Sequence, residues 1–510
     1  MKILSHILFE LFFGTRYGIA FLISVLLLII PVRSLYAVLP LPYPIDYLEK
    51  IPAIEKEELT EEEQIEEAPP TEFAPITPPD FRKQKAIGYE PDVTFRVPSG
   101  LKDKVDFWKQ IYHSYSIYQY VLHDSDYNLI YKVVDISDIS RKKISYRAQR
   151  KLLAQRLGAH KREIRALLVS VHHKRANLES MTSEERKIFD LFRNVQDPKK
   201  FWNARYNIRS QLGQKERFEQ GIIWAGRYLP MMERIFQEEG VPMELTRLPF
   251  VESSFNIKAR SKVGASGIWQ FIRSTGRRYL SINAAVDERN DPIEATRAAA
   301  RLLKANYGYL GHWPLAVTAY NHGAAGIQRA VRKVGTKDLP DIIDRYRSRT
   351  FGFASKNFYA EFLAALETEL EYQKYFGALK TEAPLEFEEV DIQKYIGIHV
   401  LTRYTGISKE MLKRYNPGLT SYVFAGKKFI PPGYRLKLPH GAKEEFMAAY
   451  GEIPSQLVAK AQKKFIYHRV RKGDTLIYLA RLYDTSVTEI RRANRIGRFL
   501  YSGQTLIIPK

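Results

Sequence analysis

Three short blocks, set at defined distances between positions 252 and 323, constrain this chain most. They read ESSF at 252–255, GASGIWQF at 264–271 and AYNHG at 319–323. A fold that brings them together would place one carboxyl, Glu252, beside a glycine-punctuated turn and several hydroxyl and amide groups. Pro249 is expected to kink or end a helix just before Glu252, and the apolar neighbours of that carboxyl would raise its pKa by burial. A carboxylic acid that stays protonated near neutral pH can donate its proton to a departing oxygen.

These blocks resemble those of the lytic transglycosylases, which cleave the glycan strands of bacterial peptidoglycan. The sequences VDERNDP at 286–292 and AAA at 298–300 bring the resemblance closest to the membrane-bound lytic murein transglycosylase D type. The resemblance implies a lyase that cleaves the MurNAc–GlcNAc β-1,4 bond with one catalytic residue, Glu252. That residue would act first as acid and then as base toward the sugar's own 6-hydroxyl, leaving 1,6-anhydro-muramyl ends.

The same resemblance implies that polar side chains line a sugar-binding groove. They are Ser253, Ser261, Gln270, Tyr320, Asn321 and Tyr359. Amide and hydroxyl groups suit this role, because they can bond N-acetyl and hydroxyl groups without adding charge. The partner would be the GlcNAc–MurNAc glycan strand, and neither a cofactor nor a metal ion is implied.

Two other functional classes remain open at this stage. In a hydrolytic muramidase of lysozyme-like fold, Asp287 or Asp291 would be the second carboxylate that most glycosidases use. Turn formation and helix capping before Pro292 are the alternative interpretation of both aspartates. A non-catalytic wall-binding protein would keep the fold and attach through a glycan-binding module, but it has no need of Glu252.

The pattern of residues 466–510 predicts a compact βααβ module. A strand leads into a Gly-Asp turn, a threonine can cap a helix, and a second helix would end before a closing strand. The module resembles a LysM domain, which binds glycans containing N-acetylglucosamine. The glycan-binding residues implied by this resemblance are Gly473, Asp474, Thr475 and Asn494.

A fainter copy of this module is predicted at 385–440. The spacing from Tyr404 to Asn416 is close to that from Tyr483 to Asn494, and both segments then reach a strand that ends in proline. The first copy lacks the GDTL opening, so we interpret it as a degenerate LysM-like repeat.

The predicted fold is mainly α. Helix-like patterns at 292–309, 314–320 and 357–370 support a lysozyme-like α-helical catalytic domain over 215–372, as the resemblance implies. Residues 96–214 are predicted to form a helical and basic N-terminal extension, since twelve Lys or Arg but one Glu lie between positions 141 and 175. The small βααβ modules complete this architecture.

The N-terminal 95 residues are predicted to lie outside the folded domains. Residues 1–37 contain a mostly apolar run at 18–32 and are expected to be a signal peptide or a membrane anchor. Residues 38–95 are expected to be an acidic, Pro-rich linker, because eight glutamates between Glu55 and Glu67 cannot help to form a core. Export to the periplasm or cell envelope is therefore expected, with attachment to the membrane if 1–37 is retained.

The amino-acid composition excludes several kinds of site and several binding partners. The 510 residues include no cysteine, which excludes disulfides, thiolate metal sites, a thiol nucleophile and a lipid-modified N-terminal cysteine. We therefore expect that the protein is not a lipoprotein. A formal net charge of +22 suits a protein that works on a polyanionic mesh such as peptidoglycan. Nucleic acid is not an expected partner of an exported protein.

Overall fold

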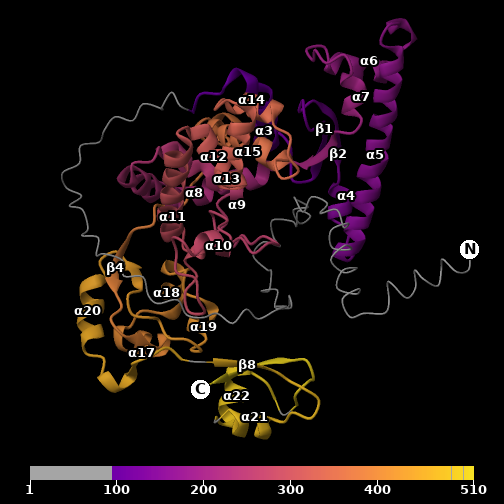
Figure 1. The fold of residues 1–510 in the computed structure, drawn as a ribbon. Helices are drawn as coiled ribbons and strands as arrows, with labels where there is room; N and C mark the ends of the chain where they lie inside the picture. Colours follow the sequence, from indigo (N-terminus) through magenta and orange to yellow (C-terminus); the bar gives the residue numbers. More distant parts are fainter. Residues whose placement is uncertain (1–94, 464, 484, 498, 510) are drawn as a thin grey trace, which may run out of the picture. The chain divides into compact units, whose positions relative to one another are not determined.

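The fold is mainly α-helical, which confirms the predicted class (Figure 1). The computed structural model describes residues 95–463, 465–483, 485–497 and 499–509. The predicted segment 1–37 and residues 38–94 of the predicted linker lie outside these ranges. None of the helices in the described ranges combines the length and the apolar composition needed to cross a bilayer.

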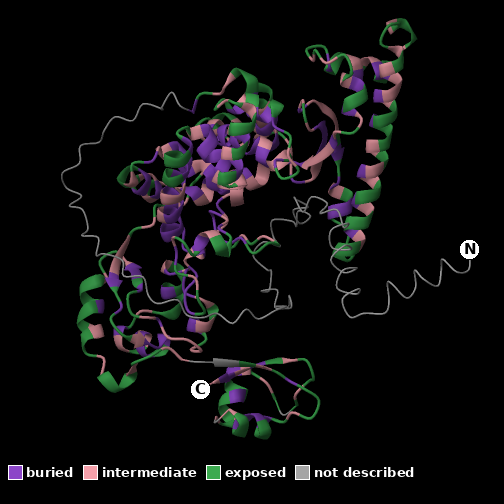
Figure 2. Ribbon diagram, viewed as in Figure 1, coloured by how far each residue is buried: buried purple, intermediate pink, exposed green. Residues whose placement is uncertain are grey.

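The central part of the chain forms a helical core. Its helices are α3 (Lys102–His113), α8 (Lys215–Glu239), α9 (Leu248–Ser253), α10 (Arg273–Gly276), α11 (Pro292–Leu310), α12 (Trp313–His322), α13 (Ala324–Val334), α14 (Leu339–Arg345), α15 (Phe353–Leu370) and α16 (Tyr372–Phe376), with 3-10 turns η3 (Ser99–Leu101), η5 (Met243–Arg247) and η6 (Glu288–Asn290). Helix α15 packs against α3, α9 and α12, and α11 packs against α8 and α12. Figure 2 shows the buried residues gathered where these helices meet.

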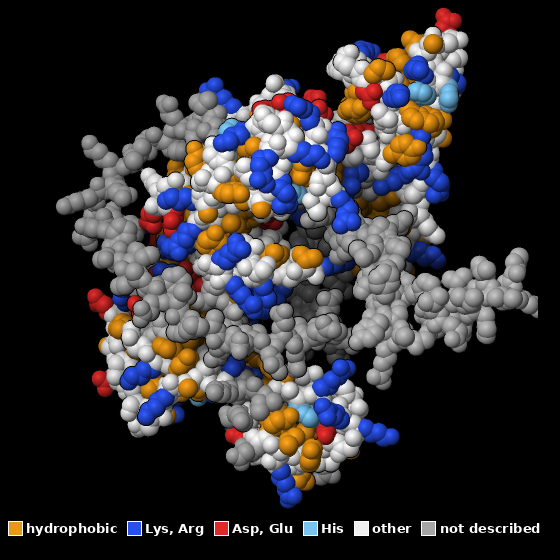
Figure 3. Space-filling model, viewed as in Figure 1, with side chains coloured by type: hydrophobic (Ala, Val, Ile, Leu, Met, Phe, Trp, Pro, Cys, Tyr) orange, Lys and Arg blue, Asp and Glu red, His pale blue; other side chains and the backbone are white. Residues whose placement is uncertain are grey.

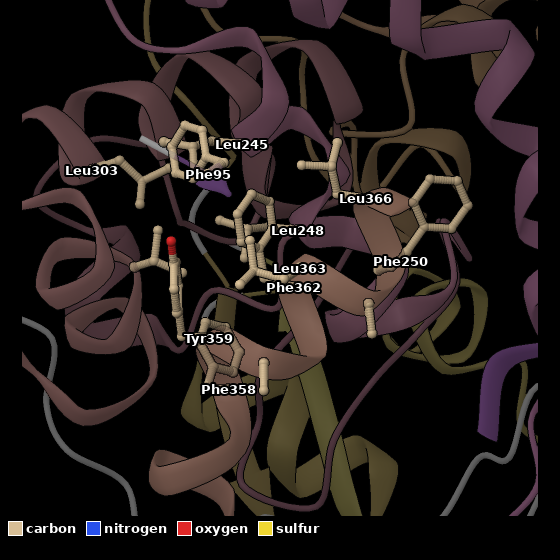
Figure 4. Packing of buried hydrophobic residues seen from close by; sticks show 14 of the residues in the cluster. Phe95, Leu245, Leu248, Phe250, Leu303, Phe358, Tyr359, Phe362, Leu363 and Leu366 are labelled. Carbon is tan, nitrogen blue, oxygen red and sulfur yellow. The ribbon is translucent and has the colours of Figure 1, made fainter. Parts of the chain in front are cut away.

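Small and aromatic residues together allow this close packing. Ala298, Ala299 and Ala300 on α11 are fully buried and have no side-chain atom beyond Cβ, so neighbouring helices can approach. Large rings then fill the space between α9 and α15, where Phe250 and Phe362 are buried (Figure 4). Dense apolar packing of this kind supplies most of the stability of such a core.

Helix α9, which carries Glu252, lies between residues that typically end or begin helices. Gly240 ends α8 in the left-handed conformation at φ 67°. Pro249 lies in the first turn of α9, where its missing N–H costs no helical hydrogen bond. The predicted break in the helix lies at this point, since η5 ends at Arg247 and Pro249 lies in the first turn of the new helix. Glu252 occupies the last turn of α9, which ends at Ser254 with φ 50°.

The N-terminal extension is more than a helical region. Its helices are α4 (Ser137–Ser140), α5 (Tyr146–Lys174), α6 (Ser183–Leu191) and α7 (Lys200–Ala204), and it also contains an antiparallel sheet of order β2-β1-β3, with β1 (Gln119–Asp124), β2 (Ile130–Asp135) and β3 (Ile208–Leu212). The sequence prediction for 96–214 missed these strands. Short apolar runs such as QYVLHD fit a strand or a buried helix equally well, and only long-range pairing decides between them.

Two small modules follow the helical core. The first contains β4 (Phe387–Asp391), β5 (Tyr395–Ile396), α17 (Ile398–Thr405), α18 (Lys409–Tyr415), α19 (Ser421–Phe424), β6 (Arg435–Pro439), α20 (Lys443–Gly451), η7 (Ser455–Leu457) and β7 (Val458–Ala459); the second contains β8 (Phe465–Arg469), α21 (Leu476–Leu482), α22 (Val487–Asn494) and β9 (Thr505–Pro509). The second module has the order β-α-α-β, and the first adds β5 and α19 between its outer strands; the two outer strands pair antiparallel in each, β4 with β6 and β8 with β9.

An asparagine holds the second helix to the last strand in both modules. The Asn416 side-chain amide donates to the Leu412 carbonyl at 3.0 Å and the Lys437 carbonyl at 2.8 Å, and its oxygen accepts from the Lys437 N–H at 2.8 Å. Asn494 makes the same three bonds, with Ile490 and Ile507 as partners, at 2.7–2.8 Å. This shared arrangement supports the interpretation of 385–440 as a degenerate LysM-like repeat.

The first module is fastened to the segment that leads into α11. The backbone N–H of Asp287 donates to the Gly418 carbonyl at 2.7 Å, and the N–H of Thr420 donates to the Ala285 carbonyl at 2.9 Å. These bonds form a short antiparallel bridge between the helical core and the module. The 385–440 module is therefore attached to the core by backbone hydrogen bonds as well as by side chains.

A buried lysine reinforces this attachment. The Lys437 ammonium, whose side chain is 2% exposed, lies 3.0 Å from the Asp291 carboxylate and 3.2 Å from that of Glu294. Burial alone would lower the pKa of Lys437, but the charges of Asp291, Glu294 and Glu389 outweigh it and hold that pKa above its ordinary value. The lysine thus stays charged between the two acids at the start of α11 and Glu389 on the paired strand β4.

We predict that Lys437→Met strongly destabilises the protein, because it leaves the buried Asp291 carboxylate without its cation and leaves Glu294 paired with Arg435 alone. The expected loss in the free energy of unfolding is about 3–5 kcal/mol, measured by chemical denaturation of the full chain followed through tryptophan fluorescence. Lys413→Met, at an exposed position on α18, is the matched control and should change stability by less than about 0.5 kcal/mol. Equal stability of the two variants would contradict a role for Lys437 in this attachment.

Candidate active site

Glu252 provides a carboxyl that is held in its protonated form. Its helix α9 buries Leu248, Pro249 and Phe250 in the core, while Glu252 itself is half-buried on the last turn. Desolvation of its carboxyl raises the pKa of Glu252 from 4.5 to about 8. At neutral pH this group is therefore a proton donor, as the sequence analysis expected for an acid catalyst.

Three further ionisable side chains lie within electrostatic reach of Glu252. Burial raises the pKa of Tyr112 and Tyr320, and the charge of Glu252 raises both further. Burial also raises the pKa of Glu361 to about 8, with an added contribution from Glu252. Two carboxyls thus share this region, and both are mainly neutral at pH 7.

Glu361 was not predicted from the sequence. It lies on α15, two residues after Tyr359, and the positions directly before and after it on this helix are buried. The packing of α15 against α9 brings it near Glu252, so the sequence carried no local signal for it. Because Glu361 is itself protonated at neutral pH, it lacks the charge that a glycosidase nucleophile needs.

The side chain of Arg289 fixes the loop at 264–271 through hydrogen bonds to its backbone. The Arg289 guanidinium is buried and donates to the Gly264 carbonyl at 2.7 Å and to the Phe271 carbonyl at 3.1 Å. Gly267 has φ 77°, and a Cβ atom there would lie 1.8 Å from the Arg289 carbonyl oxygen. Position 267 therefore accepts only glycine while the loop keeps this contact.

Three of the predicted site residues fasten this loop around Glu252. The Ser253 hydroxyl donates to the Ile268 carbonyl at 2.8 Å, and the Tyr320 hydroxyl donates to the Trp269 carbonyl at 2.8 Å. The Gln270 side-chain amide donates to the Gly267 carbonyl at 2.8 Å. The structure thus joins the first, second and third sequence blocks through hydrogen bonds to one loop.

Two more predicted residues border this arrangement. The Ser261 hydroxyl accepts from the N–H of Ala265 at 3.0 Å within the loop. The Asn321 side-chain oxygen accepts from the Ser355 hydroxyl at 3.2 Å, at the start of α15. Both residues are half-buried. Sugar binding by these residues stays a prediction, as it does for Ser253, Gln270 and Tyr320.

Tyr359 lies apart from the others. Its side chain is 1% exposed and packs in the core, with Phe358 and Phe362 on the same helix (Figure 4). Burial raises the pKa of its hydroxyl above the ordinary value. The prediction that Tyr359 lines a sugar groove is therefore not supported by its position. An aromatic residue in an apolar helix is most often part of the core.

The two aspartates considered as a second carboxylate are already engaged. Both Asp287 carboxylate oxygens accept from Arg289, each at 2.8 Å, in a buried pair. Asp291 accepts from the N–H of Ile293 at 3.0 Å as the cap of α11 and pairs with Lys437. Both side chains hold the structure together, which argues against the hydrolytic alternative.

In the described part of the chain, no group of three or more metal-ligating side chains converges.

In the C-terminal module the predicted glycan-binding residues mainly maintain the turn and helix ends. The Asp474 carboxylate accepts from His468 at 2.7 Å and from the N–H of Arg471 at 2.6 Å. Thr475 caps α21 by accepting from the N–H of Tyr478 at 3.1 Å, and Gly473 provides the positive φ of the turn. Glycan binding by these residues and by Asn494 stays a prediction.

Exposed aromatic side chains on this module were missed by the sequence analysis. They are Tyr467, Tyr478, Phe499 and Tyr501, with exposed fractions from 46% to 74%. Large exposed rings are typical of surfaces that stack on apolar faces of ligands. They are scattered over strand β8, the first turn of α21 and the loop before β9, so they gave no periodic signal in the sequence.

Two parts of the chain match models of known protein families. The family model of the transglycosylase SLT domain matches residues 232–343, and that of the LysM domain matches residues 468–509. Membrane-bound lytic murein transglycosylase D of Escherichia coli K12 is 30% identical over 281 residues, which is 53% of this chain and 61% of that protein. The chain thus matches less than two thirds of the length of this relative.

Two other similarities are more limited. LysM and putative peptidoglycan-binding domain-containing protein 1 of Xenopus laevis is 35% identical over 79 residues, which is 15% of this chain and 34% of that protein. Among solved structures, the 70 kDa soluble lytic transglycosylase SLT70 from Escherichia coli is 20% identical, with 30% of this chain and 25% of that chain covered and a TM-score of 0.24.

The raised pKa of Glu252 predicts a pH-dependent stability. The folded protein keeps this proton up to about pH 8, whereas the unfolded chain releases it near 4.5, so wild-type stability should fall as pH rises through this window. Because glutamine cannot ionise, Glu252→Gln should gain about 1–3 kcal/mol relative to wild type between pH 4.5 and 8. Thermal unfolding at both pH values measures this, and Glu410→Gln, at an exposed site on α18, should show no gain. Parallel curves for Glu252→Gln and wild type would contradict the raised pKa.

Proposed function

We propose that this chain, which carries a transglycosylase SLT domain at 232–343 and a LysM domain at 468–509, is a lytic murein transglycosylase of the cell envelope. The observation that carries the proposal is Glu252, a protonated carboxyl beside the loop at 264–271. The fold of the chain holds Asp287 and Asp291 in ion pairs with Arg289 and Lys437. Cell-wall remodelling or turnover is the role that such an activity would serve.

The chemistry proposed for Glu252 is acid catalysis followed by base catalysis. The Glu252 carboxyl gives its proton to the oxygen that links MurNAc to GlcNAc, and the bond from C1 of MurNAc to that oxygen breaks. The resulting carboxylate then takes the proton of the 6-hydroxyl of the same MurNAc, whose oxygen bonds to C1. One bond is broken and one is formed, Glu252 regains its proton, and no water is consumed.

The desolvation of the Glu252 carboxyl suits both the acid step and the base step. A pKa of about 8 keeps the acid form at neutral pH, and it makes the conjugate base stronger than an ordinary glutamate. Polar groups on the adjoining loop, among them Gln270 and Ser261, are proposed to bind the N-acetyl and hydroxyl groups of the sugar. No cofactor is needed for this sequence of steps.

The proposal and its alternatives require different roles of the carboxyl side chains. A hydrolytic muramidase of this fold needs a second charged carboxylate near the sugar, and Asp287 is held by Arg289 through two hydrogen bonds of 2.8 Å. A purely wall-binding protein would gain nothing from a carboxyl desolvated at Glu252. Attachment to glycan by the module at 466–510 is part of the proposal and adds to the catalytic role.

We predict that the protein lacking residues 1–37 releases 1,6-anhydro-muramyl products from purified peptidoglycan, as identified by mass spectrometry. Glu252→Gln should lower this activity by at least about a hundredfold, since glutamine can neither give nor retrieve the proton. The activity of the wild type should fall above about pH 8, where Glu252 loses its proton. Products with reducing muramic-acid ends alone would support the hydrolytic alternative instead.

We also predict that deletion of residues 466–510 weakens retention on insoluble peptidoglycan but leaves cleavage of short soluble glycans nearly unchanged. A linked binding module raises the effective concentration of the enzyme at the wall without touching the catalytic groups. Retention of the full-length and shortened proteins on purified sacculi, at low and high salt, measures this. Equal retention at both salt concentrations would show that the C-terminal module does not anchor the protein.

A further inference from the structure

A chain of hydrogen bonds through three side chains connects the end of α12 to the first turn of α15. Asn321 and His322 are the last two residues of α12, and Ser355 lies in the first turn of α15. The Ser355 hydroxyl donates to the Asn321 side-chain oxygen at 3.2 Å, and the His322 Nδ1 atom lies 3.1 Å from the same hydroxyl oxygen. This relay (His322, Ser355 and Asn321) joins one predicted sugar-binding residue to two residues that were not predicted to have a role.

The directions of these hydrogen bonds follow from the number of protons available. A serine hydroxyl has a single proton, and the proton of Ser355 goes to the Asn321 oxygen. His322 therefore donates to Ser355, so its ring carries a proton on Nδ1. Burial lowers the pKa of His322, and the charge of Arg329 lowers it further. At neutral pH the ring is therefore neutral, and the proton on Nδ1 is the one that it keeps.

The His322 ring is held in place by its packing. It meets the buried ring of Phe351 edge-on, with 5.1 Å between the ring centres. The imidazole also fills the space that a side chain at position 326 would take, since a Cβ atom on Gly326 would lie 2.5 Å from His322 Cδ2. This close packing keeps the ring in the orientation that turns Nδ1 toward Ser355.

The relay fixes the orientation of the Asn321 amide. An asparagine side chain has an oxygen that only accepts and an NH2 group that only donates. The oxygen of Asn321 is held by Ser355, whereas its NH2 group has no hydrogen-bond partner among the residues that the structure describes. Asn321 is half-buried and directly follows Tyr320, whose hydroxyl bonds the loop beside Glu252. A donor of fixed direction thus lies next to the candidate active site.

The charge of the protein cannot supply the same selectivity. The chain has a formal net charge of +22, and Figure 3 shows Lys and Arg spread over the face of the molecule that it draws. Such a surface attracts an anionic strand over long distances, but it does not distinguish one neutral sugar substituent from another. A fixed neutral donor does, because it is left unpaired when the matching acceptor is missing.

We propose that His322 and Ser355 are positioning residues that make Asn321 a hydrogen-bond donor to the acetamido carbonyl of a sugar in the glycan strand. The inference rests on the proposed function, which supplies an N-acetylated glycan as substrate. A sugar hydroxyl can donate or accept, so either end of the amide would suit it. A carbonyl oxygen only accepts, so it is matched by the NH2 group alone.

The kinetics of cleavage of peptide-free, N-acetylated strands test this role. Asn321→Asp keeps the acceptor for Ser355 but has no donor, so it should raise KM at least about tenfold and leave kcat nearly unchanged. Ser355→Ala frees the amide to turn and should raise KM by about threefold to tenfold. Ser355→Thr, which keeps the hydroxyl, should behave as wild type. So should Ser348→Ala, the matched control, which removes a hydroxyl bonded to Thr350 in the loop before α15.

Three outcomes would overturn the proposal. A KM of Asn321→Asp close to that of wild type would show that the sugar group donates to residue 321, as a hydroxyl can and a carbonyl cannot. Equal losses in Ser355→Ala and Ser355→Thr would show that the Ser355 hydroxyl is not what matters. A rise in KM confined to strands that carry stem peptides would assign the donor to a peptide carbonyl instead of the acetamido group.

The protonation of His322 tests the relay without reference to activity. Nitrogen NMR of the full chain with isotopically labelled histidine, assigned through His322→Gln, should show a neutral ring protonated on Nδ1. Ser355→Ala removes the acceptor and should shift the ring toward the form protonated on Nε2. A wild-type ring protonated on Nε2 would overturn the relay even if the enzyme were active. Absence of cleavage of every strand would refute the proposed function, while the NMR measurement would still decide the orientation of Asn321.

Discussion

The geometry around Glu252 depends on one buried cation, Arg289. Its guanidinium makes a two-point ion pair with Asp287 and also donates to the Gly264 and Phe271 carbonyls. An arginine is suited to this because its planar fork has five donors and remains charged. The loop that receives Ser253 and Tyr320 is thereby fixed relative to the segment before α11. Loss of this cation would leave the buried Asp287 carboxylate without its ion pair and would remove one hydrogen bond from each of the Gly264 and Phe271 carbonyls, so the effect would spread well beyond one side chain.

The region around Glu252 shows how packing alone can keep a carboxyl in the acid form that the proposed chemistry requires. The pKa of this carboxyl is raised by desolvation, and the neighbouring Glu361 is also kept neutral. Two charged carboxylates this close in an apolar setting would repel each other, so burial favours the protonated forms. The protein accepts a cost in stability for this, as proteins commonly do at functional sites.

The sequence was sufficient to predict the parts of the site that depend on local chemistry. Glu252 and the glycine at 267 could be recognised because a carboxyl in an apolar run and a positive φ in a turn leave direct traces in residue type. Strands β1 and β3 could not, since they pair across a long stretch of helices. Glu361 and Lys437 were missed for the same reason. Each appears as an ordinary charged residue until a distant element covers it.

The attachment of the 385–440 module has a consequence for how such proteins can be divided and rearranged. Lys437 neutralises acids that belong to α11, and Gly418 completes the backbone bonding of the segment before it. This repeat is thus a structural part of the catalytic unit, and a gene fragment that stops after α15 would encode a core with exposed, mutually repelling acids. Within its described residues, the C-terminal LysM module supplies no cation to the acids of α11. The inner repeat does, so its removal would have to be accompanied by changes at Asp291 and Glu294.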